Sequence, residues 1–367
     1  MLIARGDEVH FDAIGVKAFG STEPMQRDTL FRIASMTKPV VAAAALMLVE
    51  QGKIALQDPV EHWLPELANR RVLKRIDGAL DETVPAKRSI TLEDLLTLRM
   101  GYGMITQPTM NPPYPVVTAA SDMQLALFEP DPRTPHSPDE WIRRFSTLPL
   151  MDQPGDKWRY NVGSLVLGVL VARVAQRPLD QVLRERIFEP LGMHTTGFSL
   201  PLRVTQTLPG YYMTNFETGE LRCLDVSTPE EWSQPPAFPS GAGGLVSTID
   251  DFLQFGRFLM NRGVFGGQRL LSEQSVDAMA TNQLTEEQIA GGAPLLDESQ
   301  GWGYGQGVAI RPSAEWPVAG RYGWAGGYGT YWFNDPHTRT IAIVMTQTSP
   351  FLWTGALDEF ARLVGGV

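Results

Sequence analysis

The stretch SMTKPVVAAAALMLVEQG, residues 35–52, places a hydroxyl and an amine three positions apart at the start of a strongly apolar segment. Proline is suited to the first turn of a helix and glycine to the position after its end, so Pro39 and Gly52 predict a helix over about residues 36–51. Because apolar residues occur on every side of it, the segment is typical of a central buried helix rather than of a membrane span.

The first and fourth residues of this stretch, Ser35 and Lys38, form a candidate nucleophile and base. Residues three apart share a helix face, so the two side chains are expected to approach each other. Burial and the positive end of the helix dipole both favour a neutral amine, which can accept the serine proton. The alternative is structural, with Ser35 capping the helix and Lys38 extending its amine to solvent.

Composition excludes several other classes of protein. The chain has 367 residues, of which 43% are hydrophobic, and a formal net charge of −10, which argues against nucleic-acid binding. Its one cysteine, Cys223, rules out an intrachain disulfide, and its five histidines lack metal-ligand spacing, so we expect no metal and no cofactor. We find no signal peptide and no membrane-spanning run, and we expect a cytoplasmic protein.

The order of strand-like and helical patterns suggests two domains. Strand patterns occur near both ends of the chain, at residues 8–14, 30–33, 305–310, 329–333 and 340–345, and helical patterns at 91–98, 162–176, 179–189 and 357–364. We expect an α/β domain built from residues 1–70 and 240–367, and a mainly helical inserted domain over 71–239. Two proline-rich stretches, 107–115 and 129–138, are expected to be long irregular loops.

Two further segments carry possible chemistry. PGDKWRYNVGS, residues 154–164, places Tyr160 just before a helix, where a nearby lysine is expected to lower its pKa and where it can relay a proton. The alternatives are a buried structural tyrosine, and Asn161 as no more than a helix cap. YGWAGGYG, residues 322–329, leads into a strand and has the glycines that an oxyanion hole requires, or forms an ordinary hairpin.

In this order, the motifs Ser35–Lys38, 154–160 and 324–326 resemble those of the serine β-lactamase-like superfamily. Within it, the chain is most similar to family VIII carboxylesterases, relatives of class C β-lactamases and D-alanyl-D-alanine carboxypeptidases. The resemblance implies a β-lactamase/penicillin-binding-protein-like α/β fold, with an antiparallel sheet flanked by helices and an inserted helical domain. It also implies Ser35 as the nucleophile that forms an acyl-enzyme, Lys38 as its base, Tyr160 as proton shuttle, and the Ser35 and Gly327 amides as oxyanion hole.

Two departures from the β-lactamase pattern indicate the substrate. Val162 stands where those enzymes have an asparagine that contacts the substrate amide, and Trp324 stands where they have a lysine that binds the substrate carboxylate. Both changes favour a neutral ester. The residues expected to bind the substrate are Trp324, Ala325, Gly326, Tyr102, Trp158, Val162 and Tyr304.

The predicted function is therefore a serine carboxylesterase that cleaves small, short-chain acyl esters. A β-lactamase, a D-Ala-D-Ala peptidase or amidase, and an acyltransferase remain alternatives with the same chemistry. A non-enzymatic sensor that is acylated at Ser35 is the alternative from a different class. The chain has no G-x-S-x-G elbow, which excludes an ordinary Ser-His-Asp α/β-hydrolase. The oligomeric state is not predicted.

Overall fold

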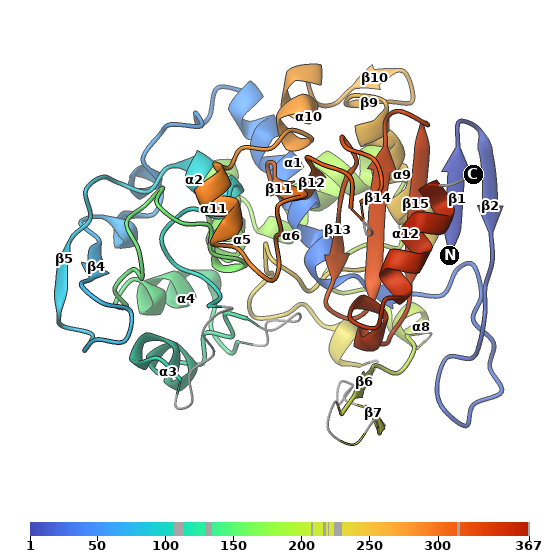
Figure 1. The fold of residues 1–367 in the computed structure, drawn as a ribbon, viewed down its shortest axis with the longest axis horizontal. Helices are drawn as coiled ribbons and strands as arrows, with labels where there is room; N and C mark the ends of the chain where they lie inside the picture. Colours follow the sequence, from blue (N-terminus) through green and yellow to red (C-terminus); the bar gives the residue numbers. More distant parts are fainter. Residues whose placement is uncertain are drawn as a thin grey trace.

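A seven-stranded antiparallel sheet forms the larger layer of the fold (Figure 1). The computed structural model describes residues 1–105, 113–128, 134–206, 208–215, 218, 220–223, 230–313 and 316–365. Both ends of the chain contribute to the sheet, whose strand order is β11 (Gln300–Trp302), β12 (Gly307–Ala309), β13 (Tyr322–Gly326), β14 (Thr330–Asp335), β15 (Thr340–Met345), β1 (Leu2–Arg5) and β2 (Glu8–Phe11).

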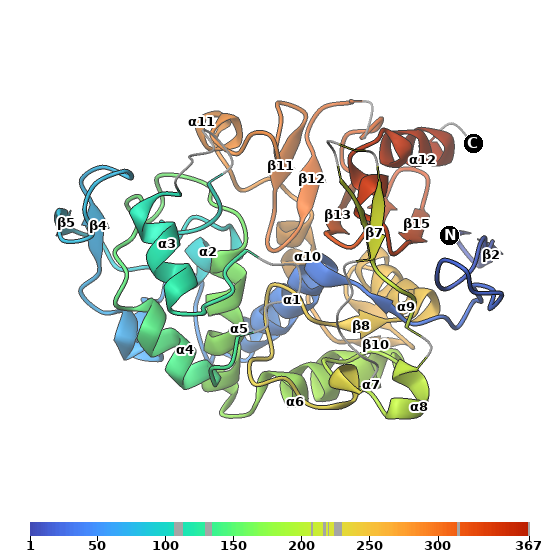
Figure 2. The ribbon, with the colours of Figure 1, turned by 90° about the horizontal axis from the view of Figure 1, so that it is seen from below.

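Both faces of the sheet are covered by helices. Along β14, Tyr331 and Phe333 pack with the C-terminal helix α12 (Ala356–Gly365), whereas Trp332 points to the opposite face. On that face lies α9 (Ile249–Met260), whose Gly256 leaves room for the Trp332 indole. Figure 2 shows α12 on one side of the sheet and α1 and α9 on the other. Burial on both faces explains why the centre of β14, residues 331–333, has three successive aromatic residues rather than an alternating pattern.

The predicted central helix is confirmed as α1 (Thr37–Glu50), one residue shorter at each end than expected. Every residue from Thr37 to Leu48 is buried. The alanines at positions 42–45 let neighbouring segments approach closely. Gly305 comes so near that an added Cβ would lie 2.5 Å from the Ala42 Cβ.

Several of the remaining helices have the positions that the sequence predicts. The predicted helical segments are confirmed as α2 (Leu92–Leu96), α5 (Val162–Ala175) and a continuous run of α6 (Leu179–Leu183), a π-helical turn (Arg184–Phe188) and α7 (Glu189–Leu191). Thr91 caps α2 in a reciprocal capping box with Asp94, as its sequence suggests. The other helices are α3 (Pro115–Asp122), α4 (Pro138–Phe145), α8 (Leu202–Thr205), α10 (Glu273–Met279) and α11 (Glu286–Ala290).

The two proline-rich stretches were predicted to be loops, but the last residue of each lies in a helix. Pro115 and Pro138 are not loop residues but the first residues of α3 and α4, where a missing N–H costs no hydrogen bond. Residues 106–112 and 129–133 of these stretches lie outside the described part of the chain.

The described part of the chain also contains four two-stranded pairs: β3 (Phe31–Arg32) with β8 (Val246–Ser247), β4 (Arg71–Leu73) with β5 (Thr83–Pro85), β6 (Tyr212–Thr214) with β7 (Leu221–Cys223), and β9 (Val264–Phe265) with β10 (Gln268–Arg269). Among the described helices, none is by itself long and apolar enough to cross a membrane. Taken together, α5 and the run over Leu179–Leu191 have the length and the apolar composition of a membrane span. The two are bent by 78° relative to each other.

Candidate active site

Ser35 is presented by a strained turn that leads into α1. It belongs to a short 3-10 turn, Ala34–Met36, and Ala34 has φ +43°, which is uncommon for a residue with a side chain. Strain of this kind persists only where the surrounding structure enforces it. Here the Ile33 N–H donates to Leu245 O at 3.0 Å, and Thr330 Oγ1 donates to Ile33 O at 3.3 Å. A strand residue, Thr330, and the residue that precedes β8, Leu245, thus hold the turn in place.

The structure brings Ser35 and Lys38 together. Lys38 Nζ lies 2.8 Å from Ser35 Oγ and donates at 2.8 Å to the carbonyl oxygen of Ala242. Only 1% of Lys38 is exposed, and Ser35 makes no capping bond, so the structural alternative for this pair is wrong. Burial lowers the pKa of Lys38 well below its usual value, which favours the neutral amine.

Tyr160 is also held by a strained turn. Asn161 has φ +82° and ψ −57°, and the Val162 N–H donates to Tyr160 O at 3.2 Å, which makes a γ-turn of the rare, strained hand. Asn161 stands at the N-cap position of α5, but its side chain makes no capping bond and instead donates to Leu127 O at 2.6 Å. Asn161 is therefore the helix cap by position, as the sequence suggests, but it is more than a cap, because its side chain anchors the turn that carries Tyr160.

The Tyr160 hydroxyl joins Ser35 to the strand motif. Trp324 Nε1 donates to the Tyr160 oxygen at 2.6 Å, and Lys38 Nζ lies 4.5 Å from the centre of the Tyr160 ring. Burial raises the pKa of Tyr160 to about 12, although hydrogen bonds with Ser35 and Trp324 act in the opposite direction. The expectation that the lysine lowers this pKa is wrong, because burial dominates and favours the neutral form of both groups.

The glycine of the Trp324-Ala325-Gly326 motif allows β13 to approach the serine turn. A Cβ on Gly326 would lie 2.3 Å from Ile33 O, so only glycine fits at this contact. Gly327 follows directly, in the turn to β14. The glycine-rich stretch is thus a hairpin, and its end lies against the Ser35 turn.

The Ser35 N–H occupies the second position of its 3-10 turn, where no acceptor within the turn is available. The oxyanion hole stays a prediction.

The predicted substrate-binding aromatics divide into two groups. Trp158 and Trp324 pack with Tyr160 and with Trp302, whose ring centre lies 4.7 Å from that of Trp324. Tyr102 and Tyr304 point elsewhere, since the Tyr102 hydroxyl donates to Val116 O and the Tyr304 hydroxyl to Glu93 Oε1. Val162, like Tyr102, is fully buried in the main core. The cluster around Tyr160 also contains residues that were not predicted, namely Leu98, Leu284, Ile289, Leu296 and Trp302.

The sequence interpretation missed the acceptor of Lys38. Ala242 lies in the small-residue stretch over 240–244, and Gly241 there packs so closely on α5 that an added Cβ would lie 2.2 Å from Ser164 O. The glycines in this stretch indicate that another backbone segment lies close to it, but they do not identify α5 as that segment. Ser240 and Gly244, on either side of Ala242, line a pocket of about 400 Å³ together with Trp232 and Phe238.

Comparisons with known proteins show the family of the chain. Residues 1–366 match the family model described as beta-lactamase. The chain is 38% identical to an uncharacterized protein of Mycobacterium tuberculosis over all of this chain and 88% of that protein. It is 30% identical to esterase EstB of Burkholderia gladioli over 95% of this chain and 85% of EstB.

A solved structure has the same fold. EstCE1, described as a hydrolase with promiscuous acyltransferase activity, superposes with a TM-score of 0.80 at 25% identity, covering 99% of this chain and 92% of its own. The order of the three motifs, the antiparallel sheet between helices and these matches lead to one conclusion. The chain belongs to the beta-lactamase family, within the serine β-lactamase-like superfamily.

Proposed function

We propose that the protein is a serine carboxylesterase that cleaves short-chain acyl esters through an acyl-enzyme on Ser35. The observation that carries the proposal is the buried contact of 2.8 Å between Lys38 Nζ and Ser35 Oγ. A neutral amine beside a serine hydroxyl is a general base in position, and proton transfer of this kind contributes about 10²–10⁴-fold to rate. The similarity to EstB supports the ester as substrate.

The hydrogen bonds form a chain with one direction. An indole nitrogen only donates, so Trp324 occupies a lone pair of the Tyr160 oxygen and leaves the phenol proton free to point at Ser35. A carbonyl only accepts, so Lys38 donates to Ala242 and keeps its lone pair for the serine proton. The Trp324–Tyr160 bond fixes one end of the chain and the Lys38–Ala242 bond fixes the other. With both ends fixed, Tyr160 donates to Ser35, and Ser35 donates to Lys38.

The reaction follows from this direction. Ser35 Oγ bonds to the ester carbonyl carbon while its proton passes to Lys38, and the N–H groups of Ser35 and Gly327 stabilise the oxyanion. When the carbon–oxygen bond of the ester breaks, Tyr160 gives its proton to the leaving alkoxide and recovers one from Lys38. A water molecule then attacks the acyl-enzyme by the same proton route and releases the acid.

Neutral groups around the serine favour a neutral substrate. Where the related β-lactamases have lysine, Trp324 uses its only polar hydrogen on Tyr160. Its ring packs against Trp302, so the position offers an apolar surface rather than a cation for a carboxylate. A β-lactam or a peptide C-terminus carries that carboxylate, whereas a simple ester does not.

Steady-state hydrolysis of p-nitrophenyl butyrate beside a chromogenic cephalosporin tests the proposal. We expect sustained release of p-nitrophenol, little cephalosporin turnover, and loss of activity in Ser35→Ala. Activity should rise with pH through the lowered pKa of Lys38 and should not fall again until near the raised pKa of Tyr160, about 12. Full activity in Ser35→Ala would refute the mechanism, and one stoichiometric burst without turnover would identify a sensor.

Acyl transfer to an alcohol is the second candidate, and the similarity to EstCE1 favours it. The acyl-enzyme is the same, and only the attacking group differs. Adding butanol to the butyrate assay distinguishes the two, because a transferase forms butyl butyrate in place of butyric acid.

A further inference from the structure

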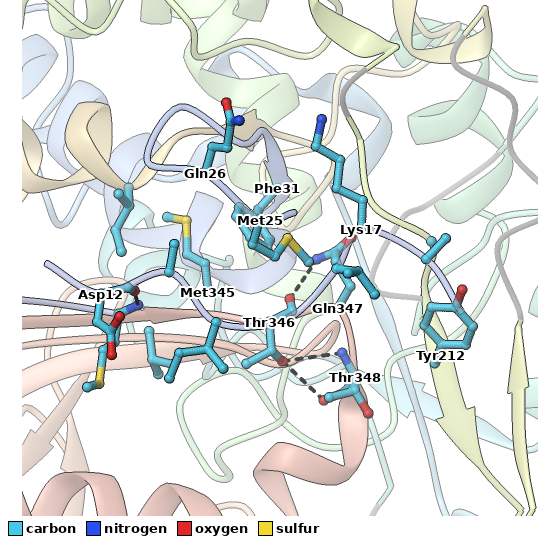
Figure 3. A pocket seen from close by; sticks show the side chains of 18 of the residues that line it. Asp12, Lys17, Met25, Gln26, Phe31, Tyr212, Met345, Thr346, Gln347 and Thr348 are labelled. Carbon is cyan, nitrogen blue, oxygen red and sulfur yellow. Dashed lines mark hydrogen bonds between the residues drawn. The ribbon is translucent and has the colours of Figure 1, made fainter. Parts of the chain in front are cut away.

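A second pocket lies away from Ser35, beneath the segment that joins β2 to β3 (Figure 3). Its volume is about 440 Å³, within the range of about 300–1,000 Å³ that small-molecule sites occupy. None of the predicted site residues lines it. Its walls come from this segment, the end of β15, the start of α9 and the β6–β7 pair, and its apolar residues include Phe11, Met25, Phe31, Ile249, Val344 and Met345.

The segment over residues 12–30 is fastened so that the pocket stays open. Within it, the Lys17 N–H donates to Glu23 O and the Met25 N–H to Gly15 O, each at 3.0 Å. Two further bonds attach it to the β6 region: Gly210 N–H to Lys17 O at 3.0 Å, and Phe19 N–H to the Tyr212 hydroxyl at 2.9 Å. A long connection held in this way is more often functional than a plain link between strands.

Exposed apolar side chains gather at the same place. Of the large apolar residues that the described part of the chain exposes, half line this pocket, namely Met1, Ile14, Val16, Phe19 and Leu221. Ile14 is 76% exposed and Phe19 72%. Single exposed apolar residues are ordinary, but a cluster of them around a preformed pocket marks an interaction site.

Each cation that lines the pocket lies near a carboxylate. At the N-terminus, burial lowers the pKa of the Met1 amine, and the neighbouring Asp12 carboxylate acts in the opposite direction. Lys17 Nζ lies 2.5 Å from Glu23 Oε1, and Arg27 makes two hydrogen bonds to Asp250 at 2.8 and 2.9 Å. Two polar side chains of the wall are also bonded within the protein: Gln347 Oε1 accepts from Arg32, and Thr346 Oγ1 donates to Gly329 O. A charged ligand would have to break one of these pairs, whereas an uncharged one would not.

We propose that this pocket is a second ligand site, which binds an uncharged molecule with a medium-length aliphatic chain, such as an alcohol or an ester. The chain lies against Met25 and Met345, whose flexible side chains adapt to an aliphatic ligand. The polar end stays at the mouth, in water. This proposal does not depend on the function of Ser35.

Methionine methyl NMR tests it directly, with 1-octanol as the probe. Met25 and Met345 report on the pocket, and Met104, which packs with the cluster around Tyr160, reports on the candidate active site. In protein labelled at the methionine methyls and carrying Ser35→Ala, we expect saturable shifts of Met25 and Met345 with one common Kd. Octanoate should bind at least tenfold more weakly, because its carboxylate would have to displace Glu23 from Lys17 or Asp250 from Arg27.

Two variants make the result specific. Ala18 lines the pocket from the connecting segment, so Ala18→Trp should fill it and weaken octanol binding at least tenfold without changing the Met104 signal. Ala79→Trp, at an exposed position outside the pocket lining, is the matched control and should bind as the parent does. Shifts that do not saturate, or that persist in Ala18→Trp, would overturn the proposal. Shifts that follow protein concentration without octanol would identify a second copy of the chain as occupant.

Discussion

At the scale of single residues, Lys38 is the group whose chemistry differs most from its behaviour in water. Burial lowers its pKa well below 10.5, and its contacts are a hydroxyl, a carbonyl and the face of a phenol ring. These surroundings solvate the charged ammonium less well than water does, so they favour the neutral amine. Placing the lysine here therefore costs stability at low pH.

This cost predicts a pH dependence with a definite sign. Between the lowered pKa of folded Lys38 and its ordinary value of 10.5, the unfolded chain binds more protons, so the free energy of unfolding rises with pH. The slope from this group is at most about 1.4 kcal/mol per pH unit. Lys38→Met should remove the contribution, as urea titrations across this window would measure. A parent-minus-variant difference that falls with pH would contradict the assignment.

Trp324 gives a second prediction at this scale. Trp324→Phe keeps the ring against Trp302 but loses the donor to Tyr160, so kcat for an ester should fall about tenfold, corresponding to about 1.4 kcal/mol, with little change in KM. Trp302→Phe is the matched control, because its lost N–H served Leu96 O, a backbone acceptor. Equal effects of the two variants on kcat would argue that Trp324 only fills space.

Sequence reasoning reached Ser35, Lys38 and Tyr160 because each stands in a short motif at a helix entrance. It could not reach the bond between Trp324 and Tyr160, which joins residues 164 positions apart, nor the carbonyl of Ala242, which has no side-chain signal. It also assigned Tyr102 and Tyr304 to the substrate by residue type alone. Both rings turn toward other partners, which only tertiary structure decides.

At the scale of elements, the contact between α5 and the 240–244 stretch holds the acceptor of Lys38. Gly168 on α5 and Gly241 face each other without side chains, and a Cβ on Gly168 would lie 2.8 Å from Gly241 N. The boundaries of α1 and α5 were predictable from proline, glycine and apolar runs. The pairing of α5 with a glycine stretch far along the chain was not predictable. Small residues indicate that another segment packs closely there, but they do not identify that segment.

Gly241→Ala tests this contact. The new methyl would collide with Ser164 O, so we expect a loss of about 1–3 kcal/mol in unfolding free energy, and a lower kcat because Ala242 moves away from Lys38. Gly291→Ala serves as control, since its Cβ would meet nothing closer than 3.4 Å. Chemical denaturation and ester kinetics measure both effects. Unchanged kcat in a stably folded Gly241→Ala protein would refute the role given to Ala242.

At the scale of the whole molecule, a buried ion pair attaches the last helix to the sheet. Arg321 Nε donates to Asp335 Oδ2 at 3.1 Å and Arg321 Nη1 donates to Ala361 O of α12 at 3.3 Å. Both side chains are at most 2% exposed. The sheet that carries Gly326 and the helix that covers its far face are thus linked by one guanidinium.

Removing one partner should be costly. Asp335→Ala leaves Arg321 buried and unpaired, so we expect a loss of about 3–5 kcal/mol in unfolding free energy, measured by urea denaturation. The double variant Arg321→Met/Asp335→Leu should recover most of it, because two apolar groups leave no orphaned charge. If Asp335→Ala were as stable as the parent, the pair would not attach α12 to the sheet.

Trapping the acyl-enzyme shows directly whether Ser35 carries the acyl group. The enzyme is mixed with p-nitrophenyl butyrate, quenched in acid within the first turnovers, digested and analysed by mass spectrometry. We expect a butyryl adduct on the peptide that contains Ser35 and none on the same peptide from Ser35→Ala. Rapid ester hydrolysis with no adduct at Ser35, or with an adduct on another residue, would contradict it.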